Sequence, residues 1–409
     1  MKKRKDCRGR VLKEGESYRK CDNRYMYRWT GKDGKRHIIY NPDLMALREE
    51  EEKIRHDLRD GIKVGENNVT VNDVYELWKN DKVGLKQTTK GNYIYMYEHF
   101  VMDGFGNIKI KDVDKTDVRR LYNDLVSKKK MTIATVDNIH TVLHQVFDVA
   151  VDKHLIRINP SSNAMGDCKK AHGYERPKRH SLTIPQQEAF INYLAKSKQY
   201  KHWLPLFTFF LGTGCRVSEV VGLRWEDLNL DEDYVSINHN LVYYQREKGK
   251  CYFSVTTTKT QAGERIIPLL PEVKKALLDE LEYQKECGIT CQAVIDGFTN
   301  FVFLNRFGNV HNPQTINRTI KRVSLAYNLQ EIEKADKEHR EPIVLPPFSC
   351  HNLRHTFATR YCENETNLKV IQEIMGHKDI ATTMDVYAEA TREAKVKSFG
   401  NLTGKIKIS

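Results

Sequence analysis

The sequence predicts a multidomain protein that is mainly α-helical and also contains small β-sheets. The chain of 409 residues is long enough for two to three domains, each with its own core. Residues 24–30 alternate aromatic and polar side chains, as a strand does, whereas residues 70–160 repeat apolar side chains at helical spacing. We therefore predict, in chain order, a domain of sheet and helix at 1–65, a helical domain at 70–165, a linker at 166–181, an α+β domain at 182–395 and a tail at 396–409.

The first domain is predicted to be a small basic sheet with one helix packed against it. Residues 24–30 and 36–40 are expected to pair as neighbouring strands across a tight turn. Asn41 or Asp43 then caps a strongly charged helix that ends near Gly61. We expect three aromatic side chains of the first strand to form a buried sheet face, in preference to a surface on which bases stack: Tyr25, Tyr27 and Trp29.

The second domain is predicted to be wholly helical. Val74, Leu77 and Trp78 recur at the spacing of one helix face. Residues 88–90 and 127–130 place small hydroxyl groups and cations at helix edges, where phosphate oxygens can bind. The lysines of the second segment also fit a simple solvated loop, which is the more frequent role of such a run.

Charge and cysteine usage limit the classes of function. Lys and Arg outnumber Asp and Glu 67 to 54, a net charge of +13, and residues 1–40 alone carry +9. This excess favours a polyanionic partner, with nucleic acid ahead of an acidic membrane surface. The nine cysteines follow no regular spacing, and we interpret Cys287 and Cys291 as ordinary thiols. Because no apolar run approaches the roughly 18 residues of a membrane span, we expect a cytoplasmic, reduced protein.

The third domain is predicted to combine helices with three strands. Thr183 is expected to cap its first helix, with Gln186 in the capping-box position. The strands are predicted at 234–245, 252–258 and 264–269, and the chain beyond them is predicted to be mainly helical to about residue 395.

Four short segments of this domain carry candidate chemistry. In residues 212–220, two glycines precede Arg216 and let it emerge from backbone that a bulkier residue would not permit. In residues 256–269, Lys259 lies at a predicted hairpin turn. Taken alone, this arginine is more simply a salt-bridging helix residue, and this lysine a solvated one.

The other two segments contain histidines. His351 and Arg354 are three residues apart and therefore share a helix face. His351 and His355 suggest a metal site, but the residue after His351 is asparagine instead of the glutamate base of a zinc hydrolase, so we expect no metal. His377 follows a glycine, and Tyr387 comes ten residues later. Taken alone, a tyrosine on a helix is normally a core residue.

In this order and spacing, the four segments resemble the catalytic motifs of the tyrosine recombinase (phage integrase) family. The layout of the whole chain is most similar to the integrases of conjugative transposons. The resemblance spans residues 182–395, and Met375 replaces the leucine that is commoner before Gly-His. It implies a site-specific DNA recombinase with six catalytic residues: Arg216, Lys259, His351, Arg354, His377 and Tyr387.

The implied reaction cuts and rejoins DNA through a 3′-phosphotyrosyl bond, without metal, ATP or another cofactor. Tyr387 is the nucleophile, His351 accepts its proton, and Lys259 protonates the departing 5′ oxygen. The two arginines bind the non-bridging phosphate oxygens, which a planar guanidinium suits better than an ammonium group does. His377 hydrogen-bonds a phosphate oxygen.

The resemblance also implies partners. The N-terminal domain binds arm sites of double-stranded DNA, the helical domain grips the core site, and the tail reaches a neighbouring subunit of a homotetramer. An excisionase and a host DNA-bending protein are implied accessory partners for integration and excision of a mobile element in a bacterial nucleoid. The candidate DNA contacts are Arg24, Arg28, Lys35, Arg36, Thr88, Lys90, Lys128, Lys129, Arg246, Lys248 and Lys250.

Three alternatives remain open at this point. A Xer-like resolvase shares the catalytic motifs, although such proteins are usually shorter and lack the extra basic domain. A type IB topoisomerase shares the nucleophile but needs no arm-binding domain. A catalytically vestigial DNA-binding regulator is expected to have lost at least one of the six residues, and all six are present.

Overall fold

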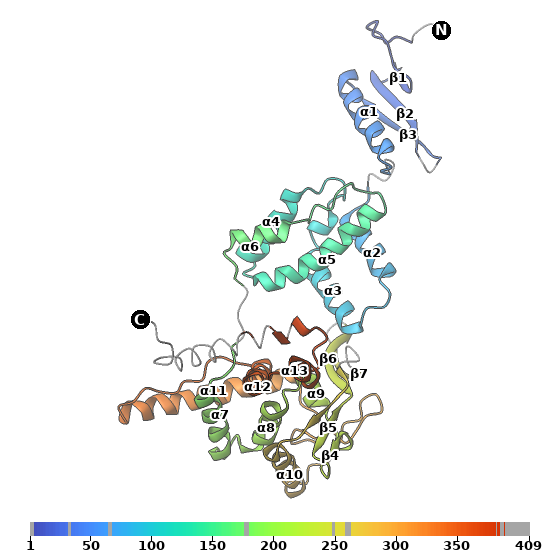
Figure 1. The fold of residues 1–409 in the computed structure, drawn as a ribbon. Coiled ribbons are helices and arrows are strands. Elements are labelled where there is room, and N and C mark those ends of the chain that lie inside the picture. Colours follow the sequence, from blue (N-terminus) through green and yellow to red (C-terminus); the bar gives the residue numbers. More distant parts are fainter. Residues whose placement is uncertain are drawn as a thin grey trace, which may run out of the picture. The chain divides into compact units, whose positions relative to one another are not determined.

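A computed structural model divides the chain into two compact units, Met1–Arg176 and Pro177–Ser409. Figure 1 shows their helices and strands. The structure describes residues 4–31, 34–63, 68–175, 180–247, 250–257, 263–381, 383–384 and 388, without the side chains of 245–247. Within these residues, no helix combines the length and apolar character that crossing a membrane requires.

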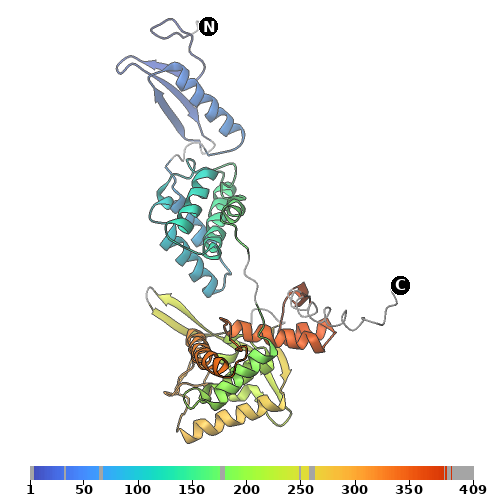
Figure 2. The ribbon, with the colours of Figure 1, turned by 90° about the vertical axis from the view of Figure 1, so that its left-hand side faces the viewer.

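The first unit begins with a three-stranded antiparallel sheet that has one helix on its face (Figure 2). The strands lie in the order β1 (Glu16–Arg19), β2 (Arg24–Thr30) and β3 (Arg36–Asn41). Asp43 caps α1 (Leu44–Arg59) by accepting two backbone hydrogen bonds through its side chain. The three aromatic residues expected on the buried face of β2 pack with Leu44 and Leu47, so that prediction is confirmed.

The rest of the first unit is a bundle of helices, as the periodicity predicted. Its helical segments are α2 (Val71–Asp81), α3 (Gln87–Phe100), the 3₁₀ turn η1 (Phe105–Asn107), α4 (Lys115–Ser127), α5 (Ile133–Asp152) and α6 (Ala164–Ala171). The expectation that Leu77 shares the buried face was wrong, because 42% of it is exposed. Val74 and Trp78 are buried as expected, and Tyr75 takes the place of Leu77 on the buried face, where it stacks on Tyr97.

The ordered helical bundle continues into the predicted linker. Residues 166–171 form most of α6, and Cys168 is buried in the core of the bundle. Asp167 binds Arg119 and Lys115 of α4, with the Lys115 Nζ at 3.3 Å. These charged residues resemble a linker in composition, but they belong to a helix whose charges pair with a neighbouring helix.

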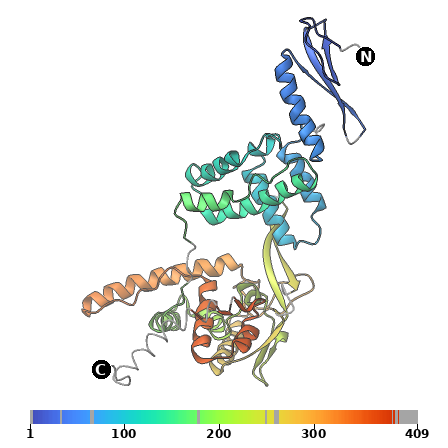
Figure 3. The same cartoon turned by 45° about the horizontal axis from the view of Figure 1, so that its top comes forward.

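The second unit combines helices with two small sheets. Its helical segments are α7 (Ile184–Lys196), η2 (Lys201–Trp203), α8 (Leu204–Thr213), α9 (Val217–Gly222), η3 (Trp225–Asp227), α10 (Pro271–Glu286), α11 (Pro313–Lys337), α12 (Cys350–Asn364) and α13 (Leu368–Met375). One sheet has the order β4 (Leu228–Asn229), β5 (Tyr234–Ile237) and β8 (Arg265–Pro268), and the other pairs β6 (His239–Glu247) with β7 (Lys250–Thr257). Figure 3 shows β6 and β7 as a long two-stranded ribbon. The predicted capping box of Thr183 and Gln186 is confirmed.

The predicted strand 234–245 is in fact two strands. The chain changes sheets at Asn238, whose side chain donates to Asp227 at 3.2 Å, and at His239, whose ring bonds to the Gly222 carbonyl at 2.7 Å. These polar contacts redirect the chain, so β5 pairs with β8 whereas β6 pairs with β7. The strands that flank Lys259 therefore belong to different sheets, and the expected hairpin between them is not formed by the described residues.

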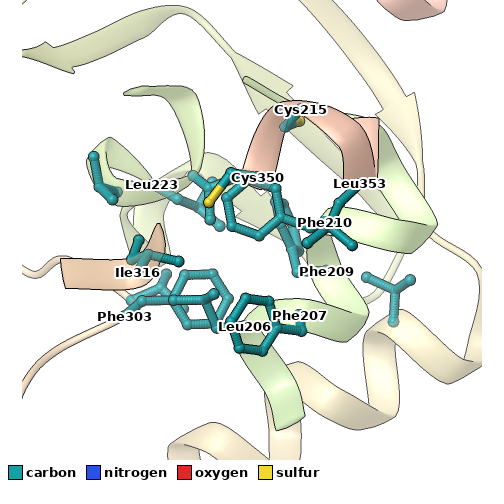
Figure 4. Close-up of a cluster of buried hydrophobic side chains, with 14 of the residues drawn as sticks. Leu206, Phe207, Phe209, Phe210, Cys215, Leu223, Phe303, Ile316, Cys350 and Leu353 are labelled. Carbon is teal, nitrogen blue, oxygen red and sulfur yellow. The ribbon is translucent and has the colours of Figure 1, made fainter. Parts of the chain in front are cut away.

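The apolar helix α8 supplies several large side chains to the core of the second unit (Figure 4). Its Phe207, Phe209 and Phe210 are almost fully buried in one core with Ile316 and Leu353. Because α8 is apolar on all sides, α7, α10 and α12 cover it, and a shift of α8 would expose large aromatic surfaces. The end of α8 is thus a firm base for the residues that follow it.

Candidate active site

The turn between α8 and α9 presents Arg216. Gly214 ends α8 in the left-handed region, with φ +62°, and a Cβ on it would lie 2.2 Å from the Phe357 ring. Gly212 is equally confined, because its Cβ would lie 2.2 Å from a methyl carbon of Val273. The two glycines therefore permit a close approach as well as a turn, and Arg216 then begins α9.

Arg216 is held by a carboxylate and by a backbone carbonyl. Its Nη1 lies 2.7 Å from Glu219 Oε1, and its Nη2 donates to the Gly376 carbonyl at 2.8 Å. The Glu219 side chain is almost completely buried, whereas 38% of the Arg216 side chain stays exposed. The guanidinium is thus oriented by two protein groups, while part of the Arg216 side chain is exposed.

Arg354 lies one turn into α12 and is buried. Its Nη1 donates to the Gly214 carbonyl at 2.7 Å, and its Nη2 donates to the Met375 carbonyl. Burial, and then the neighbouring Arg216, lowers the pKa of Arg354, which nevertheless stays cationic at neutral pH. A buried cation of this kind favours an anionic ligand. His351, on the same helix, is exposed.

His377 follows directly after the end of α13. Gly376 caps the helix in the left-handed region, and the His377 ring places Nδ1 3.0 Å from the Thr383 hydroxyl. Burial lowers the pKa of His377 to about 4, and the charges of Arg354 and Arg216 contribute to the shift. The ring is therefore neutral at neutral pH and has one nitrogen oriented by the threonine.

Two further residues belong to this cluster, and the sequence reading assigned neither a role. Arg265 of β8 lies 2.9 Å from Glu219 through its Nη2, and only 5% of its side chain is exposed. Burial alone would raise the pKa of Glu219, but the hydrogen bonds and charges of Arg265 and Arg216 bring it down to about 2. Two features of the sequence point to these residues: a glutamate three residues after Arg216, and an arginine at the start of an apolar strand.

The structure brings Arg216, Arg354 and His377 together through one short stretch, residues 374–377. Of the other three catalytic candidates, His351 is exposed on α12, and Lys259 and Tyr387 lie outside the described residues, as do Lys248 and the tail at 396–409.

Candidate DNA contacts in the first unit lie on three surfaces. Arg24, Arg28 and Arg36 are exposed, and strand register places them on the sheet face opposite the buried aromatics. Lys35 is exposed just before β3. A carboxylate oxygen of Asp22 lies 4.0 Å from Arg24, so this arginine already has an acidic neighbour.

The other candidates lie at helix ends and on the ribbon. Thr88 and Lys90 are in the first turn of α3. Lys128 caps the end of α4 and binds Asp124 at 2.8 Å, and the Lys129 ammonium lies 6.0 Å from the Phe100 ring centroid. Lys250 is exposed at the start of β7, while the side chain of Arg246 lies outside the description.

Three family models match the chain. Residues 180–394, just over half of the sequence, match the phage integrase family. Residues 1–58 match the DNA binding domain of tn916 integrase, and residues 70–126 match the N-terminal SAM-like domain of phage integrases.

Individual relatives span most of the chain. The transposase from transposon Tn916 of Enterococcus faecalis is 28% identical over 413 residues, which cover 98% of this chain and 96% of that protein. The Tn1549 transposon integrase, solved with transposon right end DNA, gives a TM-score of 0.69 at 26% identity over 82% of this chain and 100% of that one. A lambda integrase tetramer on a Holliday junction shows the same fold, with a TM-score of 0.50 at 18% identity over 92% and 95% of the two chains.

Proposed function

The chain belongs to the phage integrase family, the tyrosine recombinases, which bind, break and rejoin DNA, and from this premise we propose that it integrates and excises a transposon. The observation that carries the proposal is the convergence of Arg216, Arg354 and His377 on residues 374–377. Similarity to the Tn916 transposase over nearly the full length of both chains supports a transposon as the element.

Arg216 and Arg354 are proposed to bind the scissile phosphate. In the transition state, negative charge gathers on the non-bridging oxygens, and donors fixed in advance stabilise that charge most. Arg354 is buried and Arg216 is half-exposed, so together they form a cationic site with one open side. A phosphate on that side would offset the cost of burying the Arg354 charge.

The chemical step exchanges one ester bond for another. The Tyr387 oxygen attacks phosphorus, forms the 3′-phosphotyrosyl bond and displaces the 5′ oxygen. His351 takes the tyrosine proton, and Lys259 gives a proton to the 5′ oxygen. Because the phosphotyrosyl ester conserves the energy of the phosphodiester bond, a second 5′-hydroxyl reverses the exchange without ATP. In this mechanism the charge on the phosphate is stabilised by the two arginines instead of a metal. His377, neutral and oriented by Thr383, hydrogen-bonds a phosphate oxygen.

The remaining parts of the chain are proposed to hold the DNA. The domain at 1–65 binds arm sites through the outer face of its sheet, and the domain at 70–165 binds the core site. The match of residues 1–58 to an integrase DNA-binding domain supports the arm-site role and favours an integrase over a Xer-like resolvase. The linker is shorter than predicted, because residues 166–171 belong to α6, and it joins the helical domain to the catalytic domain at 182–395.

Assembly is proposed to involve four copies on two DNA sites. The tail at 396–409 reaches a neighbouring subunit. When each subunit contacts the next in the same head-to-tail way, the assembly forms a closed ring if the rotation between neighbours divides a full turn evenly. An excisionase and a host DNA-bending protein are proposed as accessory partners. Deletion of the tail is expected to leave single-site binding intact and to weaken synapsis, which a gel-shift assay with one and two sites measures.

Sequencing of DNA junctions tests the proposed function in cells that carry the gene beside its element. With the natural chain we expect a precise circular form of the element and a rejoined donor site, and neither product with Tyr387→Phe. The purified reaction is expected to continue in EDTA. Junctions that still form with the Tyr387→Phe chain, or a strict requirement for a divalent ion, would contradict the proposal.

A further inference from the structure

A third arginine reaches the segment that precedes His377. Arg265 lies at the start of β8 and donates from Nε to the Ile374 carbonyl at 2.7 Å. Its two terminal nitrogens lie 2.9 and 3.2 Å from the two carboxylate oxygens of Glu219. Because the side chain is buried, Arg265 is enclosed by protein groups instead of facing DNA.

Three arginines from three different elements thus hold three consecutive carbonyls. Arg265 binds the carbonyl of residue 374, Arg354 that of residue 375 and Arg216 that of residue 376. These groups lie at the C-terminal end of α13, where carbonyls lack helical partners and carry partial negative charge. Cationic donors satisfy them, and the backbone that they hold leads directly into His377.

Glu219 links Arg265 to Arg216. Oε1 receives Nη1 of both arginines, at 2.7 Å from Arg216 and 3.2 Å from Arg265. Oε2 receives the backbone N–H of Arg216 at 2.7 Å and Nη2 of Arg265 at 2.9 Å. The carboxylate is therefore shared between a buried arginine and a half-exposed one. Without Arg265, Glu219 would have Arg216 as its remaining arginine partner and would draw its guanidinium inward.

We propose that Arg265 is a positioning residue for DNA cleavage, which acts through Glu219 on the orientation of Arg216 and through Ile374 on the placement of His377. The inference rests on the proposed roles of Arg216 and His377. Arg265 itself does not touch the phosphate. A lysine at position 265 would keep the charge but lose the fork that binds Glu219 and the carbonyl together.

The test compares Arg265→Gln and Arg265→Lys with a matched control, Arg340→Gln, in the full chain. Arg340 also forms a two-pronged pair with a glutamate, Glu331, in the same unit, but it does not bind residues 374–376. Single-turnover cleavage of a suicide oligonucleotide, DNA affinity and thermal stability are measured for each protein. The titration of His377 is followed by NMR with labelled histidine, which reports on its surroundings independently of catalysis.

Arg265→Gln is expected to lower the cleavage rate about 100-fold, because a small misplacement of catalytic groups causes a loss of this size. DNA affinity should be retained. In this variant the midpoint of the His377 titration should rise, because a neighbouring positive charge is lost. Arg265→Lys should keep the midpoint near that of the natural protein and still cleave more slowly, which separates geometry from charge. Arg340→Gln should change neither the rate nor the midpoint.

If both Arg265 variants cleave as fast as Arg340→Gln, the positioning role is overturned. Cleavage by the natural chain would still support the proposed function. Failure of both variants to fold would assign Arg265 to stability and also overturn it. If the natural chain itself does not cleave, the proposed function fails, and this inference fails with it.

Discussion

Arg216 and Arg354 hold the end of α13, and in the proposed mechanism each also receives a phosphate. A guanidinium has five donors in a planar fork and can do both, whereas the compact ammonium of lysine cannot. We therefore expect Arg216→Lys or Arg354→Lys to lower cleavage by about 100-fold or more, with DNA binding largely retained. Suicide-substrate cleavage measures this, with Arg340→Lys as a control outside the site. A rate within about tenfold of the natural protein would contradict the phosphate role.

His377 gives a prediction about pH. Its pKa is lowered to about 4 in the folded chain from the ordinary value of 6.5, so the unfolded chain binds more protons between these values. The stabilisation from the neutral ring is complete above about pH 6.5 and is lost as the pH falls towards 4. Thermal midpoints of the natural chain should fall more steeply across this window than those of His377→Gln. Parallel curves would count against the lowered pKa.

Single residues also show how far sequence reasoning reaches. Arg216, Arg354 and His377 were predictable, because each lies in a short motif with a fixed local spacing. Glu219 lies in the segment of Arg216 and Arg265 in that of Lys259, but their roles depend on contacts between positions 46 and 109 residues apart in the chain. Such pairings are set by the tertiary fold, so the local sequence can draw attention to Glu219 and Arg265 but does not show which distant groups they contact.

The turn between α8 and α9 is the element on which the site is built. Gly214 and Gly288 have nearly the same φ, +62° and +63°, but a Cβ on Gly214 would meet Phe357 whereas one on Gly288 would meet open space. Gly288→Ala is expected to cost about 1 kcal/mol through backbone strain alone. Gly214→Ala should cost about 1–3 kcal/mol more through overpacking and should also slow cleavage. Equal melting temperatures for the two variants would contradict the role of close packing at this turn.

Helices with local caps and the pairing of β2 with β3 were predicted well, whereas the strand partners in the second unit were not. The capping box of Thr183 and Gln186 and the charged helix after Asp43 follow from side chains within a few residues of each other. The division of the predicted strand at Asn238 depends on contacts with Asp227 and Gly222, and the periodicity of a strand says nothing about which sheet it joins.

At the scale of the whole molecule, we propose that arm-site and core-site DNA are bound by separate surfaces. The double variant Arg28→Ala, Arg36→Ala should weaken arm-site binding. The slope of the logarithm of the binding constant against the logarithm of salt concentration should become shallower by about one unit for each phosphate contact that is lost. Binding to the core site should be unchanged. Lys53→Ala with Arg59→Ala removes the same charge from exposed positions of α1 and is the matched control. Equal losses from the two pairs would show a general charge effect and contradict a specific sheet surface.

The measurement that tests the central claim most directly is the identity of the residue that becomes bonded to DNA. A suicide substrate trapped by the natural chain, followed by proteolysis and mass spectrometry, should place the 3′ phosphate on Tyr387. Tyr387→Phe should bind the same DNA and form no adduct. An adduct that persists in Tyr387→Phe, or one on another residue, would contradict the account.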